Sequence, residues 1–178
     1  MNRKLSNEEL GRPSVDEARD AVKLPLVVVL DNVRSLANVG SIFRTCDGFG
    51  VAELYLTGIT GTPPHREINK TALGATESVK WSQYVDATEL VKRLIREGYE
   101  VYSVEQAVDS IALHQWKTKT MTKPLCLVFG NEVNGVDQSI IDLSNGVLEI
   151  PQQGMKHSLN VSVAAGIILW EAYKALTD

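Results

Sequence analysis

No apolar run in this sequence approaches the roughly 20 residues that a membrane-spanning helix needs, so we expect no membrane segment. Residues 1–23 alternate in charge and have no apolar core of the kind found in secretory signals. Cys46 and Cys126 are the only cysteines, and neither has a Cys or His partner at the spacing of metal ligands. We therefore expect buried thiols, no metal ion and a reducing, cytoplasmic location.

The usual nucleotide-binding and hydrolase motifs are missing as well. No Gly-x-Gly-x-x-Gly follows a predicted strand, and no Gly-x4-Gly-Lys-Ser/Thr occurs, which argues against dinucleotide enzymes and P-loop NTPases. There is no Gly-x-Ser-x-Gly elbow, and His65, His114 and His157 are isolated from one another. A serine hydrolase or a zinc site is therefore not indicated.

The chain also has no excess of basic residues. Its net charge is -4 and its sequence pI is about 5.4, which argues mildly against nucleic-acid binding. Charge can nevertheless be local, because several cations fall in or near the polar loops described below. These are Arg34, Arg44, Arg66, Lys70, Lys156 and His157. The net charge alone does not decide between classes of partner.

What is present fits one soluble domain. A length of 178 residues with 44% hydrophobic and 22% charged residues is ordinary for such a fold. Residues 1–23 are predicted to be an N-terminal extension, with a helix starting near Ser14, and residues 24–178 are predicted to be the domain. We see no internal repeat and no low-complexity tract.

Apolar periodicity predicts alternating strands and helices in residues 24–178. Strands are expected at 26–30, 51–57, 99–104, 125–129 and 147–150, and helices near 38–49, 87–97 and 160–176. The stretch 57–78, with Pro63-Pro64 inside it, reads as a long loop. Alternation of this kind predicts an α/β fold with a mainly parallel sheet flanked by helices. Ligands of such sheets bind at the carboxyl ends of the strands.

The first polar cluster follows the strand at 26–30 and reads Asn38-Val-Gly-Ser-Ile-Phe-Arg44-Thr. Asn38 alone could simply cap a helix, and Arg44 alone could be a solvated charge. The second cluster, Gly130-Asn131-Glu132-Val133-Asn134-Gly135, could be a tight turn in which glycines supply unusual backbone angles. That interpretation leaves Glu132 without a role.

The third cluster runs from Ile150-Pro151 through Gly154 to Ser158-Leu-Asn160-Val-Ser, at the start of a long apolar helix. Ser158 and Asn160 could also be plain helix caps. In this order and spacing, however, the three clusters resemble the motifs of the SpoU/TrmH branch of the SPOUT RNA methyltransferases. The resemblance covers nearly all of residues 24–176.

This resemblance implies transfer of a methyl group from S-adenosylmethionine to a ribose 2′-hydroxyl of tRNA or rRNA. It also implies that the C-terminal segment of the chain threads a deep trefoil knot, and that the protein is a homodimer whose active sites draw on both subunits. The implied catalytic residues are Asn38, Arg44, Glu132, Ser158 and Asn160. Cofactor contacts, largely through backbone groups, are implied for Gly130, Ile150, Leu159, Val104 and Glu105, and RNA contacts are expected from Arg34, Arg66, Lys70 and Lys156.

Two questions stay open at the level of sequence. An arginine side chain normally stays charged, so Arg44 is better suited to clamp phosphate and ribose than to act as a base. The proton could leave through Ser158, a water molecule or the RNA phosphate. The alternative function is a non-catalytic RNA-binding or ribosome-assembly protein that retains the fold. The acidic pI favours it, and the full set of polar residues in the three clusters speaks against it.

Overall fold

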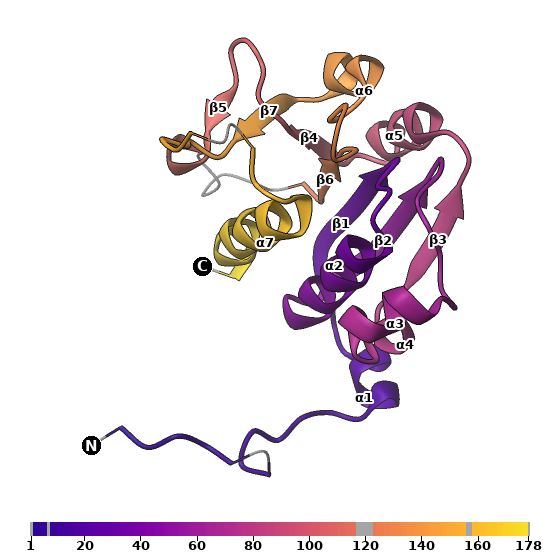
Figure 1. Ribbon diagram of the computed structural model, residues 1–178, viewed down its shortest axis with the longest axis vertical. Helices are drawn as coiled ribbons and strands as arrows, with labels where there is room; N and C mark the ends of the chain where they lie inside the picture. The colour runs from indigo at the N-terminus through magenta and orange to yellow at the C-terminus, as the bar shows by residue number, and fades with distance from the viewer. Residues whose placement is uncertain (1, 7, 117–122, 156–157, 178) are drawn as a thin grey trace.

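A computed structural model describes residues 2–6, 8–116, 123–155 and 158–177. The strands are β1 (Leu24–Asp31), β2 (Val51–Thr57), β3 (Trp81–Tyr84), β4 (Glu100–Val104), β5 (Ile111–Ala112), β6 (Leu125–Phe129) and β7 (Gly146–Glu149). The helices are α1 (Val15–Asp20), α2 (Leu36–Gly48), α3 (Arg66–Ala72), α4 (Ala75–Ser78), α5 (Ala87–Arg96), α6 (Gln138–Leu143) and α7 (Val161–Thr177), with a short 3₁₀ helix at Leu113–Gln115. Figure 1 shows their arrangement around the sheet.

The strands form one seven-stranded sheet in the order β3-β2-β1-β6-β4-β7-β5, and every pair of neighbours is parallel. The predicted α/β fold with a mainly parallel sheet is therefore confirmed. Because β1 and β6 are central, both of their faces are covered, and each reads as a continuous apolar run.

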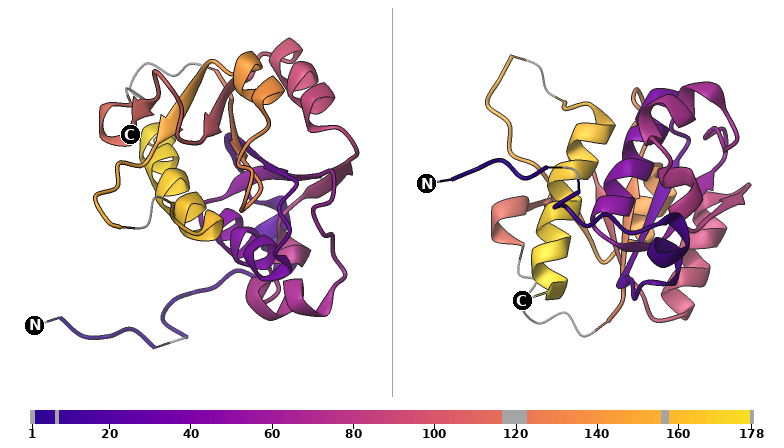
Figure 2. Two further views of the ribbon diagram at one scale, coloured as in Figure 1. Left: turned by 45° about the horizontal axis from the view of Figure 1, so that its top comes forward. Right: turned by 90° about the horizontal axis from the view of Figure 1, so that it is seen from below.

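Helices cover both faces of the sheet, so the core has two layers. Leu26, Val28 and Leu30 of β1 pack in the layer that contains α2 and α7, while Val27 and Val29 pack with α5 and α6. Figure 2 shows α2 and α7 on one side of the sheet. The alternation of β1 side chains between these layers follows from the two-residue period of a strand.

The local signals read from the sequence explain several element boundaries. Ser14 and Glu17 form a capping box at α1, and the Asp86 side chain accepts a hydrogen bond from the Glu89 amide at the start of α5. Gly98, with φ of +94°, follows the end of α5. Cys46 and Cys126 are free and buried, and burial raises the pKa of both thiols.

The expected long loop at 57–78 is wrong. Residues 66–72 form α3 and residues 75–78 form α4, and β3 follows at 81–84. Helix α3 is packed tightly on α2, because the Thr71 hydroxyl donates to the Ala37 carbonyl at 3.0 Å. A Cβ at Gly40 would lie 2.2 Å from the Ile68 carbonyl oxygen, so only glycine allows this approach. Strand β5 and helix α6 were also not predicted.

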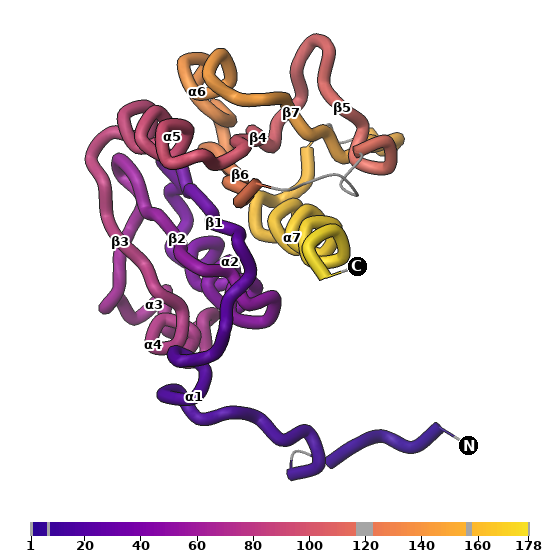
Figure 3. The backbone as a smooth tube through the Cα atoms, turned by 180° about the vertical axis from the view of Figure 1, so that it is seen from behind, coloured from indigo at the N-terminus to yellow at the C-terminus, as the bar shows by residue number. Residues whose placement is uncertain are grey.

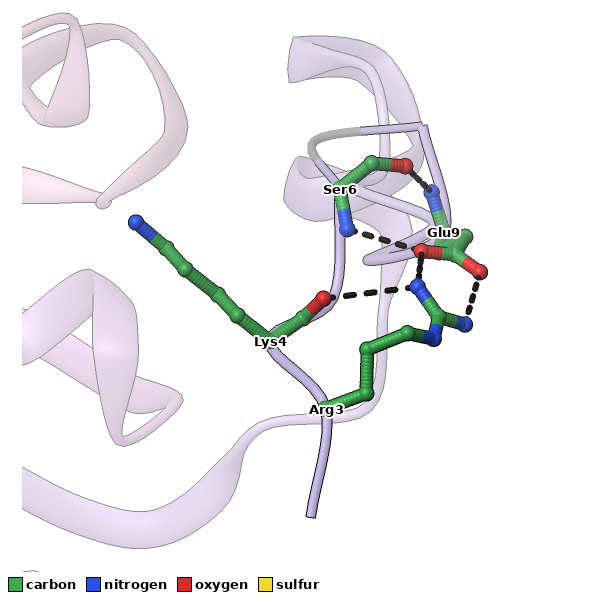
Figure 4. Close-up of polar contacts among 4 residues, drawn as sticks. All are labelled: Arg3, Lys4, Ser6 and Glu9. Carbon is green, nitrogen blue, oxygen red and sulfur yellow. Dashed lines mark hydrogen bonds and ion pairs between the residues drawn. The ribbon is translucent and has the colours of Figure 1, made fainter. Parts of the chain in front are cut away.

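The N-terminal residues lead away from the body of the molecule, as Figure 3 shows from behind. Within this arm, Arg3 forms an ion pair with Glu9 at 2.7 Å, and the Glu9 carboxylate accepts a bond from the Ser6 amide at 2.8 Å (Figure 4). Further along, Arg19 of α1 donates to the carbonyl of Glu77 in α4. The division into an extension at 1–23 and a domain at 24–178 stays a prediction. Among the described helices, none has the length and apolar character to cross a membrane.

Candidate active site

A cavity of about 370 Å³ lies at the carboxyl edge of the sheet, where β4, β6 and β7 end. Three segments far apart in the sequence line it, and together they hold most of the predicted cofactor and catalytic residues. The lining residues are Val104, Glu105, Gln106, Phe129, Gly130, Asn131, Glu132, Val133, Gly135, Leu148, Ile150, Gln152, Ser158, Leu159, Asn160, Val161 and Ala164. The second and third polar clusters therefore meet at one cavity.

Glu132 connects the second cluster to the first. Its Oε2 accepts a hydrogen bond from the Arg34 amide, and its Oε1 accepts bonds from the Ser35 amide and the Asn38 side chain, all at 2.9 Å. Burial on its own would raise the pKa of Glu132, but these three donors together lower it. The carboxylate is thus held ionised against the start of α2, and it is a poor candidate for a general base.

Asn38 connects the first cluster to the third. It is 8% exposed, and while its Nδ2 donates to Glu132, its Oδ1 accepts from Asn160 Nδ2 at 3.1 Å. Asn160 Oδ1 accepts bonds from the Ser162 amide and hydroxyl, so it also caps the start of α7. A chain of side-chain hydrogen bonds therefore joins Glu132, Asn38 and Asn160. The capping role and the site role of Asn160 are both present.

The β6–α6 turn is built around Asn131. Its backbone pairs with Gly135 in both directions, at 3.0 and 2.9 Å, and its Oδ1 accepts from the Val133 amide at 2.8 Å. Its Nδ2 donates to the Asn32 carbonyl at 2.7 Å, which ties this turn to the end of β1. A Cβ at Gly130 would lie 2.1 Å from the Gly135 carbonyl carbon, so the turn itself requires glycine there.

Ser35 and Asn131 take part in this network, although no role was predicted for either from the sequence. Ser35 caps α2 by accepting from the Asn38 amide at 3.3 Å, and its own amide holds Glu132. Asn131 lies inside the second cluster and Ser35 lies three residues before the first, so a polar residue shortly after a buried strand was the available signal. Local sequence patterns do not show which hydrogen-bond partner each side chain has, because that depends on tertiary packing.

Arg44 lies apart from the cavity. It is exposed on α2, a turn and a half beyond Asn38, and it is not among the residues that line the pocket. Arg44 is thus not grouped with Glu132, Ser158 and Asn160 within one chain, and its catalytic role stays a prediction.

The predicted RNA-binding cations are placed as follows. Arg34 is exposed in the β1–α2 loop, and Arg66 and Lys70 are exposed on α3 rather than in a loop. None of these, nor Arg44, forms an ion pair with a described residue, whereas Lys80, Lys92, Arg93 and Lys174 do. Lys156 lies outside the described residues.

A second hollow of about 220 Å³ lies nearby, lined by Asp31, Asp86 and Asp137 among others. Asp31 is 3% exposed, and burial raises its pKa, with the nearby Asp137 and Asp86 carboxylates adding to the effect. Within the described ranges, no group of three or more His, Cys, Asp or Glu side chains could hold a metal ion.

Comparison with known proteins identifies relatives over almost the whole chain. The model of the SpoU rRNA Methylase family matches residues 25–170. A tRNA (guanosine(18)-2′-O)-methyltransferase of Thermus thermophilus is 34% identical over 166 residues, which is 93% of this chain and 83% of that protein. A 23S rRNA (guanosine-2′-O-)-methyltransferase of Vibrio parahaemolyticus is 30% identical over 94% of this chain and 66% of its own length.

Two solved structures share the fold. The crystal structure of the A. aeolicus TrmH/SpoU tRNA modifying enzyme superposes with a TM-score of 0.79 at 30% identity, covering 90% of this chain and 80% of that one. The AdoMet-bound rRNA methyltransferase from Sinorhizobium meliloti gives a TM-score of 0.80 at 28% identity, covering 90% of this chain and 61% of that one.

Proposed function

Because the chain belongs to the SpoU rRNA methylase family, we propose that its 370 Å³ cavity is the site at which it methylates RNA. The reaction is the transfer of a methyl group from S-adenosylmethionine to a ribose 2′-hydroxyl. The observation that carries this assignment is the hydrogen-bonded chain of Glu132, Asn38 and Asn160, which joins the first sequence cluster to the two clusters that line the cavity.

The lining of the cavity fits the cofactor. Its volume lies within the range of about 300–1,000 Å³ that is typical of small-molecule sites. Apolar side chains suited to an adenine ring alternate with amides, hydroxyls and carboxylates suited to the polar parts. The apolar set is Val104, Phe129, Leu148, Ile150, Leu159, Val161 and Ala164. We assign cofactor contacts to Gly130, Ile150, Leu159, Val104 and Glu105.

S-adenosylmethionine, when bound, supplies an electrophilic methyl group. The chain must hold the ribose oxygen in line with this methyl group. Alignment of this kind lowers the activation barrier by several kcal/mol, and in ideal cases by roughly 7–11 kcal/mol. Glu132 contributes by fixing the Arg34–Ser35 backbone and hence the start of α2. Asn38 and Asn160 lock α2 to α7. These residues position the helix that carries Arg44.

The ribose hydroxyl must also lose a proton as it reacts. Ser158 lines the cavity, and its hydroxyl has no hydrogen-bond partner among the described residues. We assign it to relay this proton: the Ser158 hydroxyl accepts the ribose proton while it donates its own hydroxyl proton to a solvent water molecule. Arg44, as a permanently charged group, binds phosphate and the developing negative charge on the ribose oxygen.

We propose that the RNA lies over α2 and α3. Arg34, Arg44, Arg66 and Lys70 are exposed there and have no ion pair with a described residue, so they are free to contact phosphates. Contacts of this kind explain how a protein with a net charge of -4 binds a polyanion. The same role is proposed for Lys156. We expect a cytoplasmic location, where the RNA is found.

Transfer RNA is the substrate class that we favour. The T. thermophilus tRNA methyltransferase is 34% identical to this chain, whereas the V. parahaemolyticus rRNA methyltransferase is 30% identical. To test this, the protein would be incubated with labelled S-adenosylmethionine and with separate tRNA and rRNA fractions of its host. Label in tRNA is expected; label confined to rRNA would refute the choice, and label in neither would refute the enzyme.

A second copy of the chain is proposed to complete the site. Val163, Ile167 and Trp170 lie along one stripe of α7 and are 51%, 36% and 47% exposed, which is unusual for large apolar side chains on a helix already packed against α2. We propose that these stripes meet across a two-fold axis and that Arg44 of one subunit approaches the cavity of the other.

Light scattering tests the dimer. A mass twice the 19.6 kDa of one chain is expected at micromolar concentration. Trp170→Glu should shift the mass toward that of one chain. Val85→Glu, at an apolar side chain that is 93% exposed but lies on the β3–α5 loop, should leave it unchanged. A fully active monomer would refute the shared site.

We further propose that the C-terminal segment threads a deep trefoil knot. The chain leaves β7, which lies between β4 and β5, and returns across the sheet to α7, which contacts α2 and β1. Stretching the chain from its two ends should give a final length shorter than that of an unknotted chain of 178 residues. A full contour length would refute the knot.

A further inference from the structure

Glu105 places a second carboxylate in the cavity, and the cofactor contact assigned to it above leaves open which group of the cofactor its side chain binds. Resting on the proposed function, we propose that the Glu105 carboxylate accepts hydrogen bonds from the 2′- and 3′-hydroxyls of the cofactor's ribose. Glu105 would thereby make the site specific for a ribonucleoside cofactor. It lies at the end of β4 and lines the cavity beside Val104 and Gln106.

The carboxylate is held in place at both of its oxygens. Oε1 accepts a bond from the Gln106 amide at 2.8 Å, and Oε2 accepts one from the Val136 amide at 3.1 Å. A carboxylate has about four acceptor positions, so each oxygen can accept a further hydrogen bond. Glu105 is therefore both oriented and able to bind a donor.

Gly135 shapes the space that the carboxylate occupies. Its φ is +70°, and a Cβ built on it would lie 2.0 Å from Glu105 Oε2. A side chain at this position would push the carboxylate out of its place. Glycine at position 135 thus allows the tight turn after β6 and also leaves room for the Glu105 carboxylate.

Glu132 is the other carboxylate that lines the cavity in the described part of the chain, and its oxygens already bind the start of α2. Three donors from residues 34–38 hold it, two of them on Oε1. Glu105 is held instead by the end of β4 and by the β6–α6 turn. The two carboxylates therefore lie on different walls of the cavity: Glu132 lies on the wall next to α2, and Glu105 lies on the wall next to β4.

The chemistry of the cofactor indicates which donor Glu105 meets. Two neighbouring hydroxyls match the two oxygens of one carboxylate, and in dinucleotide-binding folds an acidic side chain hydrogen-bonds the ribose 2′-hydroxyl. Val104, Leu148 and Ile150, which line the same cavity as Glu105, offer apolar surface for the attached adenine. The reacting end of the cofactor must face Asn160 and Ser158, where the ribose of the RNA is aligned.

Calorimetry with S-adenosylhomocysteine and its 2′-deoxy analogue tests this assignment. The wild type should bind the deoxy analogue about tenfold more weakly or worse, as expected for a lost bond to a charged acceptor. In Glu105→Gln the ratio of the dissociation constants of the deoxy analogue and S-adenosylhomocysteine should fall to about twofold, because the acceptor has lost its charge. Glu132→Gln, a matched change at the other carboxylate, should keep the wild-type ratio.

A merely structural role of Glu105 gives a different result. If the side chain only braces the turn, Glu105→Gln weakens both ligands equally and the ratio stays at its wild-type value, which would overturn the inference. A wild-type ratio near one would also overturn it. If Glu105→Gln is poorly folded, Glu105→Asp withdraws the carboxylate by one methylene and must lower the ratio as well. No binding of S-adenosylhomocysteine to the wild type would instead refute the proposed function.

Discussion

Asn160 Nδ2 donates a hydrogen bond of 3.1 Å to Asn38 Oδ1, although 122 residues separate the two. Asn38 is also bonded to Glu132, so its removal leaves a partner unsatisfied on each side. We expect Asn38→Ala to lower the free energy of unfolding by about 1–3 kcal/mol. Methyl transfer should fall more than cofactor affinity, because α2 loses its alignment with the cavity.

Urea titration and single-turnover kinetics would measure these effects. Asn134→Ala is the control, because Asn134 is exposed in the adjacent turn and the described residues offer its side chain no hydrogen bond. That variant should stay within about 0.5 kcal/mol of the wild type. Equal losses from both variants would contradict the role given to Asn38.

Glu132 should make stability depend on acid pH. Burial raises the pKa of the Glu132 carboxyl, but the three hydrogen-bond donors lower it by more, so its pKa in the folded state lies below the ordinary value. The charge of Glu132 therefore stabilises the fold above the ordinary glutamate pKa of about 4.3. This contribution is lost as pH falls through the lower folded value. The destabilisation caused by Glu132→Gln should therefore be largest near neutral pH, about 1 kcal/mol after solvent screening, and should shrink below pH ~4.

Asp31 should show the opposite trend. Burial, together with Asp137 and Asp86, raises its pKa in the folded state. Its ionisation therefore costs stability as pH rises from the ordinary aspartate value of about 3.9 through the folded one. Relative to the wild type, Asp31→Asn should gain stability from pH 3 to pH 7, where Glu132→Gln loses it. Parallel denaturation curves at several pH values would decide, and the same trend in both variants would contradict these assignments.

Gly40 controls how α3 sits on α2. A Cβ there would lie 2.1 Å from Thr71 Oγ1 and 2.2 Å from the Ile68 carbonyl oxygen. Gly40→Ala is expected to cost about 1–3 kcal/mol through overpacking and to weaken RNA binding by displacing Arg66 and Lys70. Gly48→Ala, at the other end of the same helix with nothing within 4 Å, should be neutral or slightly stabilising. A neutral Gly40→Ala would refute the close contact.

Arg44→Ala should reduce methyl transfer by about a hundredfold or more while leaving cofactor affinity nearly unchanged, because Arg44 lies outside the cavity of its own chain. Mixing it with a variant blocked at the cavity, such as Ala164→Phe, should restore part of the activity in hybrid dimers. Each hybrid would contain one cavity with a functional Arg44 from its partner. Mixtures that stay inactive while forming dimers would contradict the shared site.

Sequence patterns predicted the central elements because these carry strong local signals. The apolar runs of β1 and β6 and the cap at Asp86 depend only on neighbouring residues. Helix α3 was missed because it is short and polar and follows Pro63-Pro64. Its packing on Gly40 is a tertiary contact. Edge strands as short as β3 and β5 give too few residues for a period to show.

Sequence patterns predicted which segments of the chain come together at the cavity, but not which hydrogen bonds join them. The carboxyl ends of parallel strands share one edge, so Gly130, Ile150 and Ser158 were expected to meet, and they do. That Glu132 binds the backbone of residues 34–35 depends on how two distant turns pack. The same holds for the side chain of Glu105, whose partner amide lies 31 residues away.

The chemical identity of the product tests the account most directly. Host tRNA would be incubated with the protein and S-adenosylmethionine, digested to nucleosides and analysed by mass spectrometry. We expect a 2′-O-methylated nucleoside, formed in equal amount to S-adenosylhomocysteine and reduced by about a hundredfold or more in reactions with Arg44→Ala. A methyl group on a base, or no methylated nucleoside despite measured cofactor binding, would contradict it.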